Sequence, residues 1–183
     1  MPVAALVAFA ALATPFFDFE SDFDAASRLY DAGNPKAALS KLVALSKKYP
    51  QEYKATRLYH VEVALAANEQ QGRVFTKSLM TGAFAKDWQS LAGIAPAVEH
   101  LKVAQPATWN LALSAGKRAA QLNPKSAEAQ EAIGISYLGL KNKALAKAAF
   151  DRAVSLAKKD KAPDPGYVTW LVDRRKSLAL RKF

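Results

Sequence analysis

The spacing of small residues in the segment 127–158 restricts the fold more than any other feature of this sequence. Gly134 lies in the first half of the segment, and Ala146 and Ala153 lie in the second half. Two helices that cross closely need small side chains where their backbones approach. The spacing from Gly134 to Ala146 fits one helix, a short turn and the start of another helix, so the segment predicts a pair of closely packed helices.

The two helices of this pair are expected over 127–140 and 143–158, with 141–142 as the turn between them. Two aromatic side chains, Tyr137 and Phe150, would fill the space between the helices and toward a neighbouring pair. The frequent alanines agree with this prediction, because alanine has the highest intrinsic helix propensity.

A second copy of the pattern runs from about Phe19 to Pro50. Here Gly33 is expected to end the first helix, Asn34 to cap the second and Pro35 to lie in its first turn. Pro50 would stop the second helix, because proline lacks the backbone N–H that a helix needs.

A third unit is expected over 93–126, because counting one period of 34 residues back from Ala146 and Ala153 reaches Ala112 and Ala119. Pro96 would disturb the start of this unit, and Pro106 would disturb its turn.

The remaining unit, 53–92, has no such clear pattern. We expect a first helix over 53–67, a lengthened polar turn over 68–72 and a second helix over 73–86. If the units are in register, four residues occupy one equivalent and normally small position on successive first helices: Ala26, His60, His100 and Gly134.

The segment 127–158 resembles a tetratricopeptide repeat, whose period is 34 residues. The family's usual Trp near the repeat start is absent, and Lys158 stands where its proline usually lies. The resemblance implies an all-α fold, a right-handed α-solenoid of about three to four helical hairpins. The units would be 19–52, 53–92, 93–126 and 127–160. The residues expected to pack between helices are small or aromatic: Gly134, Tyr137, Ala146, Phe150, Ala153, Ala38, Ala112 and Ala119.

The segment 164–183 is interpreted as a helix that caps the last repeat, whose outer apolar face would otherwise meet water. Pro165 and Gly166 would start this helix, and Arg181 and Lys182 would suit its C-terminal end. Its apolar residues can share one broad face: Tyr167, Val168, Leu171, Val172, Leu178 and Ala179.

The N-terminal segment 1–14 contains an apolar run over 3–13 that is too short to span a bilayer as a helix. Its length and the small residues that end it are typical of a cleaved secretory signal, although no Lys or Arg precedes it. We expect export to the periplasm or beyond the cell, with an apolar helix in a cytoplasmic protein as the alternative. Residues 16–23 would form the linker and first helical turn or, alternatively, a docking segment.

The composition limits the chemistry that the chain can perform. Hydrophobic residues make up 51% and charged residues 23% of the chain, which is typical of a folded globular protein. Cysteine is absent, which excludes disulfides, thiolate catalysis and cysteine-based metal sites. The two histidines, His60 and His100, lack the spacing of a metal motif, so we expect packed, hydrogen-bonded side chains.

No catalytic motif is present: the sequence has neither a GxSxG elbow nor a phosphate-binding glycine-rich loop. We therefore expect no catalytic residue, no metal and no cofactor, and we interpret the chain as a non-enzymatic scaffold or adaptor. In the tetratricopeptide family, the first helices of the repeats line a concave groove that binds a segment of a partner protein. The resemblance assigns these residues to that groove: Phe23, Ser27, Tyr30, Lys54, Arg57, Val61, Leu101, Glu128, Glu131 and Ile135.

The basic clamp with which some family members hold acidic chaperone tails is absent, because Phe23, Ser27, Glu128 and Ala132 stand at the matching places. A protein or peptide partner with apolar anchors is therefore expected. The formal net charge of +10 leaves an alternative, a basic accessory protein that contacts nucleic acid or an anionic membrane surface. Arg174, Arg175 and Lys176 would face different directions around a helix and form no single stripe, which argues against both contacts, and we place nucleic acid below a membrane surface.

Overall fold

The computed structural model describes residues 14–101, 103–160 and 164–180, which form α-helices, one short 3₁₀ helix and connecting turns, with no strand among them. The expected all-α helical repeat solenoid is thus confirmed. The expected signal run over 3–13 lies outside the described residues, as do Arg181 and Lys182. Export therefore stays a prediction, which N-terminal sequencing of the mature protein would test.

The helices run in this order: α1 (Thr14–Asp31), α2 (Pro35–Lys48), the 3₁₀ helix η1 (Glu52–Thr56), α3 (Arg57–Ala67), α4 (Glu69–Thr81), α5 (Trp88–Glu99), α6 (Pro106–Leu122), α7 (Ala127–Gly139), α8 (Lys143–Lys158) and α9 (Pro165–Leu180).

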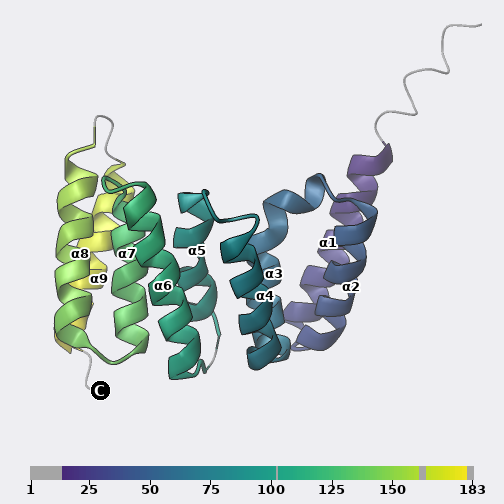
Figure 1. Ribbon diagram of the computed structural model, residues 1–183, viewed down its shortest axis with the longest axis horizontal. Coiled ribbons are helices and arrows are strands. Elements are labelled where there is room, and N and C mark those ends of the chain that lie inside the picture. The colour runs from purple at the N-terminus through teal and green to yellow at the C-terminus, as the bar shows by residue number, and fades with distance from the viewer. Residues whose placement is uncertain (1–13, 102, 161–163, 181–183) are drawn as a thin grey trace, which may run out of the picture.

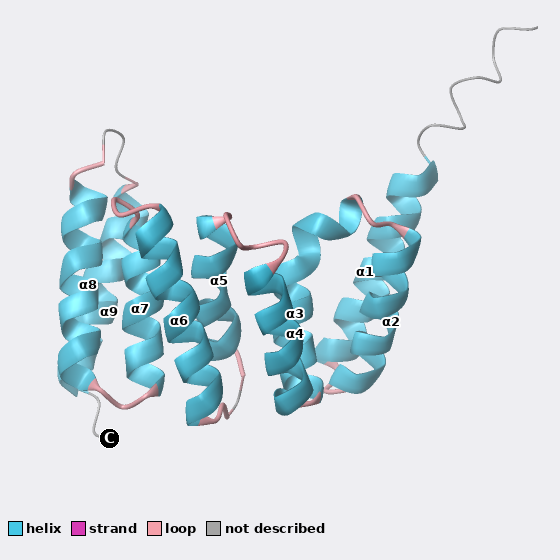
Figure 2. Ribbon diagram, in the orientation of Figure 1, coloured by secondary structure: helices cyan, strands magenta, loops and turns pink. Residues whose placement is uncertain are grey.

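The α-helices pack as four successive hairpins followed by α9. We call α1, α3, α5 and α7 the first helices of the hairpins, and α2, α4, α6 and α8 the second helices. Figure 1 shows the hairpins side by side in chain order, with α1 and α2 at one end and α9 beside α8 at the other. Short loops and turns lie between successive helices in the described part of the chain (Figure 2). Each hairpin therefore contacts mainly its neighbours in the chain, as in a solenoid.

Asparagine side chains start three of the four second helices. The Oδ1 atoms of Asn34, Asn68 and Asn142 each accept a hydrogen bond from the backbone N–H three residues later, at 3.0–3.2 Å. The predicted cap at Asn34 is confirmed, with Pro35 as the first helical residue and Gly33 at a φ of 78° just before it. This left-handed φ suits glycine, which has no Cβ to clash.

The residue four positions after each of these caps is small and buried: Ala38, Gly72 and Ala146. At Gly72 the two helices approach each other closely, because a Cβ atom added there would lie 2.6 Å from the backbone N and Cα of Leu65. The backbones of α3 and α4 therefore touch, and only glycine fits between them.

The last hairpin follows the sequence prediction to within one residue, with α7 ending at Gly139 rather than 140. A Cβ atom at Gly134 would lie 2.9 Å from the Phe150 ring, so this aromatic side chain occupies the space that glycine leaves. The small residues assigned to helix packing are all fully buried: Ala38, Ala112, Ala119, Ala146 and Ala153. Tyr137 is half-buried against the same core.

The prediction of a lengthened turn over 68–72 is wrong. Asn68 caps α4, which begins at Glu69 and ends at Thr81, so the turn is as short as the one before α2. The polar residues at 69–71 suggested a loop, but they form the exposed first turn of the helix. The useful signal was Asn68 itself, which lies one tetratricopeptide period after Asn34.

The third hairpin also begins earlier than predicted. The Asp87 carboxylate accepts the Ser90 backbone N–H at 3.1 Å and starts α5 at Trp88, before residue 93. Pro96 lies inside α5, and Pro106 is the first residue of α6, where a missing N–H costs nothing.

This earlier start moves His100 out of the expected equivalent position. Because α5 ends at Glu99, His100 lies just beyond the helix and is exposed, with its Nδ1 atom 3.1 Å from Glu62 Oε2. His60, in contrast, is buried, and its ring centroid lies 4.4 Å from that of Phe75. The prediction of packed, hydrogen-bonded histidines therefore holds only in part: His60 is packed, but its Nδ1 atom has no hydrogen-bond partner among the described residues, and His100 is hydrogen-bonded but exposed.

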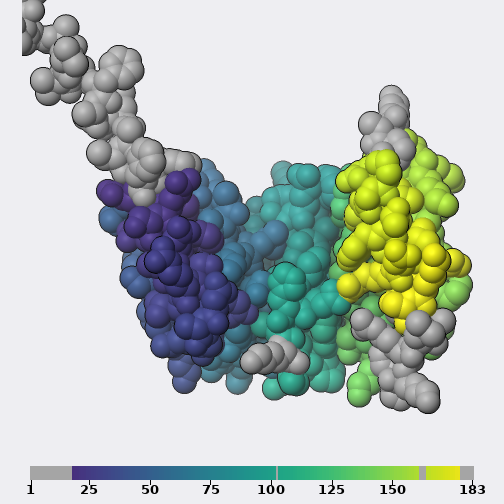
Figure 3. All heavy atoms as spheres, turned by 180° about the vertical axis from the view of Figure 1, so that it is seen from behind, coloured from purple at the N-terminus to yellow at the C-terminus, as the bar shows by residue number. Residues whose placement is uncertain are grey.

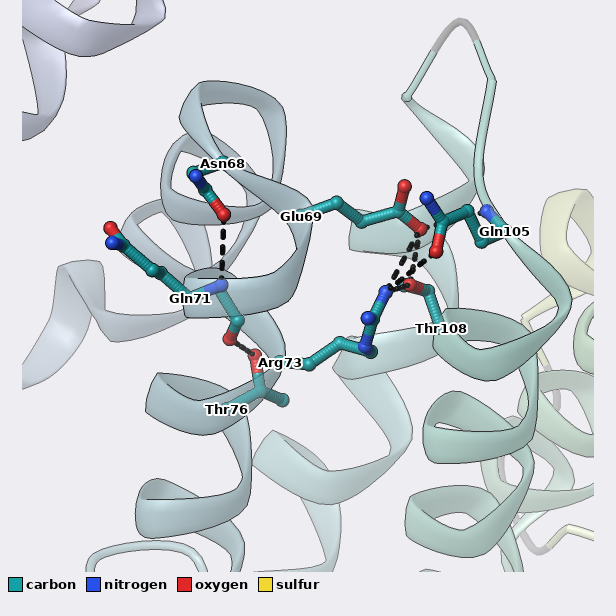
Figure 4. Close-up of polar contacts among 8 residues, drawn as sticks. Asn68, Glu69, Gln71, Arg73, Thr76, Gln105 and Thr108 are labelled. Atoms are coloured by element: carbon teal, nitrogen blue, oxygen red, sulfur yellow. Dashed lines mark hydrogen bonds and ion pairs between the residues drawn. The ribbon is translucent and has the colours of Figure 1, made fainter.

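The buried apolar residues form two clusters that meet at α3. The smaller cluster joins α1, α2 and α3 and includes Val63, whereas the larger one extends from Val61 to Leu171. Between α4 and α6 the connection is polar (Figure 4). Glu69 accepts hydrogen bonds from the Gln105 backbone N–H at 2.7 Å and from the Thr108 hydroxyl, so it caps α6 from another hairpin.

Arg73 completes this polar junction. Its guanidinium lies 3.6 Å from the Glu69 carboxylate and donates to the Thr108 hydroxyl at 3.1 Å and to Gln105 Oε1 at 3.3 Å. The side chain of Gln105 makes no capping bond, and Glu69 accepts the backbone N–H of Gln105, as the glutamate of a capping box does.

We expect Gly72→Ala to destabilise the protein by about 1–3 kcal/mol, because backbone atoms of Leu65 cannot move aside for a methyl group. Urea denaturation followed by circular dichroism measures the shift. The control is Gln70→Ala at an exposed site on the same helix, which should change stability by less than about 0.5 kcal/mol. An unchanged midpoint for Gly72→Ala would show that the helices do not cross this closely.

We expect Glu69→Ala to cost about 1–3 kcal/mol, because the fully buried Thr108 hydroxyl loses its acceptor. Glu69→Gln should lose less stability than Glu69→Ala, because the glutamine amide oxygen can still accept the hydrogen bond from the Thr108 hydroxyl. The glutamine variant loses only the ion pair with Arg73. The same denaturation assay ranks the two variants, and equal losses would argue against an acceptor role for Glu69.

Candidate functional site

The face formed by the first helices is the candidate site. Seen from behind, this face is hollowed between α1 at one end and α9 at the other (Figure 3). The described residues form three separate depressions along or beside it, of about 650, 270 and 540 Å³. We call the surface formed by α1, α3, α5 and α7 the first-helix face.

An aromatic cluster lies at the α1 end of the face. The ring centroid of Tyr59, on α3, lies 5.2 Å from Phe23 and 5.8 Å from Tyr30, both edge-on. The Tyr59 hydroxyl also donates to the Ser27 hydroxyl at 3.3 Å. Three residues assigned to the groove, Phe23, Ser27 and Tyr30, therefore meet around Tyr59, which the sequence analysis did not single out.

The largest depression, of about 650 Å³, lies where α1, α3 and α5 end. Tyr30 and Leu101, two of the assigned groove residues, line it together with His100. Burial is the main cause that raises the pKa of Tyr30, and the neighbouring charge of Glu62 adds to it. The Tyr30 hydroxyl therefore stays protonated and can donate a hydrogen bond at physiological pH.

A smaller depression of about 270 Å³ lies between α5 and α7. Trp88 and Pro96 provide apolar surface, and Glu128 and Glu131 provide carboxylates from the facing helix. Both glutamates were assigned to the groove, and the structure brings them together here. The combination of an aromatic ring with carboxylates suits a segment that is both apolar and basic.

Helix α9 closes the far end of the face. Its Tyr167 hydroxyl donates to Glu131 at 2.6 Å, and its Arg174 guanidinium pairs with Glu99 on α5. The same guanidinium lies 5.1 Å from the Trp170 ring centroid and 6.0 Å from that of Phe150. The predicted capping helix thus contacts α7 and α8, which form the last hairpin, and also α5 of the hairpin before it. Its Leu171 is fully buried in the larger apolar cluster.

Acidic residues dominate the first-helix face. Desolvation on burial is the main cause that raises the pKa of Glu131, and the Tyr167 hydrogen bond and the Arg174 charge oppose it. The carboxylates on or beside this face are Asp31, Glu62, Glu99, Glu128 and Glu131. This local acidity contrasts with the formal net charge of +10 of the whole chain, so the basic excess lies elsewhere.

Two assigned groove residues do not belong to the face. Val61 and Ile135 are 0% and 1% exposed and pack inside the larger apolar cluster. Their apolar side chains face the neighbouring helices, because these positions lie on the sides of α3 and α7 that pack into the core. Lys54 is exposed on η1, Arg57 is half-buried at the start of α3, and neither lines the three depressions.

The face contains further residues that the sequence analysis did not assign to the groove: Tyr59, Glu62, Trp88, Glu99, Tyr167 and Arg174. Trp88 could have been found from Asp87, a helix-capping residue directly before an apolar run. Arg174 carries no such signal, because its contacts come from α5 and α8, far away in the sequence.

The described residues include no group of three or more His, Asp or Glu side chains arranged to hold a metal ion. In this part of the chain, no helix combines the length and the apolar character needed to cross a membrane.

Comparisons with known proteins found no matching family model and no curated protein with a similar sequence. A thermophilic TPR protein from Thermus thermophilus is similar in structure, with 18% identity, a TM-score of 0.49, and coverage of 89% of this chain and 100% of that one. The MamA RS-1 ArsTM double mutant has 15% identity and a TM-score of 0.48, covering 88% of this chain and 94% of that one. TPR stands for the tetratricopeptide repeat, the family that the segment 127–158 resembles in sequence.

We expect Tyr167→Phe to destabilise the protein by about 1.5–3 kcal/mol at pH 7, because Glu131 loses a hydrogen bond to its charged form. Glu131 has a raised pKa, so its burial favours folding at low pH and opposes folding as pH rises through that pKa. Removing the hydrogen bond from Tyr167 raises the pKa of Glu131 further. The loss of folding stability in Tyr167→Phe should therefore be smaller at a pH where the Glu131 carboxyl is protonated. Urea midpoints at pH 7 and pH 4 measure both effects, and equal losses at the two pH values would contradict them.

Proposed function

We propose that this protein is a non-enzymatic scaffold or adaptor that binds a segment of a partner protein on the first-helix face. The observation that carries the proposal is the chemistry of the hollowed face, where both aromatic rings and carboxylates line the depressions or lie beside them. Grooves that bind peptides combine apolar anchor sites with a few polar groups that fix the orientation.

The partner segment that fits this face has apolar anchors and a net positive charge. The Tyr59 cluster and the depression beside Trp88 offer apolar contact at two separate places. Carboxylates lie next to both, so Lys or Arg residues near the anchors would gain electrostatic complementarity. An acidic partner would meet like charges on this face, although the chain as a whole is basic.

The alternative function, binding of nucleic acid or an anionic membrane, would use the basic surface outside this face. It predicts a steep loss of binding as salt concentration rises, because phosphate contacts release counterions. Competition by a polyanion at low salt would identify that mode.

A pair of matched glutamine variants tests the proposal. Gln89 is exposed on α5 and lines the depression beside Trp88, whereas Gln121 is exposed on α6 and lies outside the three depressions. We expect Gln89→Arg to weaken capture of the protein partner by about tenfold, or about 1.4 kcal/mol, because it adds bulk and repels a basic segment. Gln121→Arg should leave capture unchanged.

Purified full-length protein is used as bait, and the recovered partner is then titrated against both variants at two salt concentrations. Equal binding by Gln89→Arg and the original protein would remove the first-helix face as the binding site.

A further inference from the structure

Charge is divided unevenly between the two layers of helices. With histidine neutral, the second helices contain twelve Lys or Arg residues and two carboxylates, Glu69 and Asp151, so their formal charge is +10. The first helices contain nine carboxylates and two basic residues, Arg28 and Arg57, so their formal charge is −7. The stack is therefore acidic on the side of the first helices and basic on the side of the second helices.

We call the exposed side of α2, α4, α6 and α8 the second-helix face. Figure 1 shows α2, α4 and α6 nearer to the viewer than α1, α3 and α5, so this face is directed away from the first-helix face. Each of its four helices exposes at least one basic residue that forms no ion pair with another described residue: Lys47, Lys77, Lys117 and Arg152. These charges are available to a partner of opposite charge.

The lysines of α2 and α4 point outward. Lys47 lies about 180° around the helix axis from the buried Ala38, and Lys77 lies about 140° around the axis from the buried Gly72. Because Ala38 and Gly72 face the neighbouring first helices, the two lysine side chains extend into solvent on the opposite side.

Aliphatic side chains are exposed among these charges. Three of them lie on the second helices and are 40%, 67% and 45% exposed: Val43, Val74 and Leu145. Lys47 follows Val43 by four positions and Lys77 follows Val74 by three, so each lysine lies beside a valine on the helix surface. An apolar depression of about 330 Å³ also opens between α2 and α4, next to Val43. The second-helix face thus combines positive charge with aliphatic surface.

We propose that the second-helix face binds the surface of an anionic lipid membrane. Its Lys and Arg side chains lie at the level of the lipid phosphates, because each is attracted by the negative surface potential of an anionic bilayer. Val43, Val74 and Leu145 insert between the headgroups and leave water, as the apolar residues of interfacial helices do. The acidic first-helix face then points away from the membrane and stays open to a protein partner.

Nucleic acid fits this face less well than a membrane does. Phosphates would pair with the lysines, but proteins that bind single strands also stack bases on aromatic rings, and the large apolar side chains exposed on this face are aliphatic. A second copy of the chain could place its acidic first-helix face here. However, two molecules that each carry a formal net charge of +10 repel one another before they touch, whereas an anionic bilayer attracts the whole molecule.

Flotation of the whole chain with lipid vesicles tests the proposal. One set of vesicles contains phosphatidylcholine alone, and the other also contains phosphatidylserine at about 30%. At a salt concentration of about 0.15 M, we expect at least about tenfold higher affinity for the vesicles with phosphatidylserine. The affinity for them should fall as salt rises, because salt screens the attraction between lysines and anionic lipids.

Two double variants locate the binding. Lys47→Glu combined with Lys77→Glu reverses two charges on the second-helix face, and we expect the affinity for the anionic vesicles to fall by at least about tenfold. The matched control combines Arg28→Glu with Lys86→Glu, since both residues are exposed and lie outside the second helices. Both double variants lower the net charge equally, so the control should lose less than about threefold if the position of the charge matters. Urea denaturation checks that both stay folded.

Two substitutions at Val74 test the apolar contribution. We expect Val74→Ser to weaken binding to the anionic vesicles by about two- to threefold and Val74→Leu to strengthen it by a similar factor, because the side chain leaves water on binding. Both changes should persist at high salt, since neither alters a charge.

The proposal is overturned if the two kinds of vesicle bind equally, if the two double variants lose affinity to the same extent, or if the Val74 variants match the original protein. It is also overturned if a DNA duplex or an RNA strand binds more tightly than the anionic vesicles at the same salt concentration. Sedimentation that shows oligomers which dissociate in the Lys47 and Lys77 double variant would assign the face to a second copy instead. Capture of the protein partner should be unchanged in that double variant, so the proposal stands or falls separately from binding on the first-helix face.

Discussion

The close crossing of the two helices within each hairpin is the constraint on which the rest of the structure depends. An asparagine side chain starts α2, α4 and α8, and four residues later the helix presents alanine or glycine to its neighbour. At Gly72 the approach is so close that a methyl group would meet the backbone of Leu65. Because the cap sets where the helix begins and the small residue sets where it crosses, the two together fix the register of these three hairpins. The aromatic and apolar side chains then fill what space remains.

The outer hairpins could be predicted from the sequence because their signals are local. Gly33, Asn34 and Pro35 form a complete turn pattern, and the spacing of Gly134, Ala146 and Phe150 describes one hairpin without reference to any other. The middle hairpins were placed less well, since a loop was expected where the polar first turn of α4 lies and α5 begins earlier than expected. In both cases a capping side chain, Asn68 or Asp87, decides the boundary; Asn68 had been assigned to a turn, and Asp87 had been given no role.

The candidate site was predicted only in part, for a physical reason. Phe23, Ser27, Tyr30, Leu101, Glu128 and Glu131 do lie on or beside the first-helix face. Val61 and Ile135 do not, because a first helix is contacted by neighbours on both sides and has a narrow exposed stripe. A shift of one residue along such a helix turns a side chain by about 100° and moves it from groove to core. Contacts made by α9, such as the pairing of Arg174 with Glu99, depend on tertiary packing and leave no local pattern.

The division of the core into two apolar clusters affects how the array responds to stress. Since each hairpin contacts mainly its neighbours, stability passes along the stack from one interface to the next. Helix α3 belongs to both clusters, because Val63 packs into the smaller one and Val61 and Leu65 pack into the larger one. Local opening of the α1–α2 hairpin would expose only the smaller cluster, so we expect this end of the stack to open at a lower free energy than the larger C-terminal part.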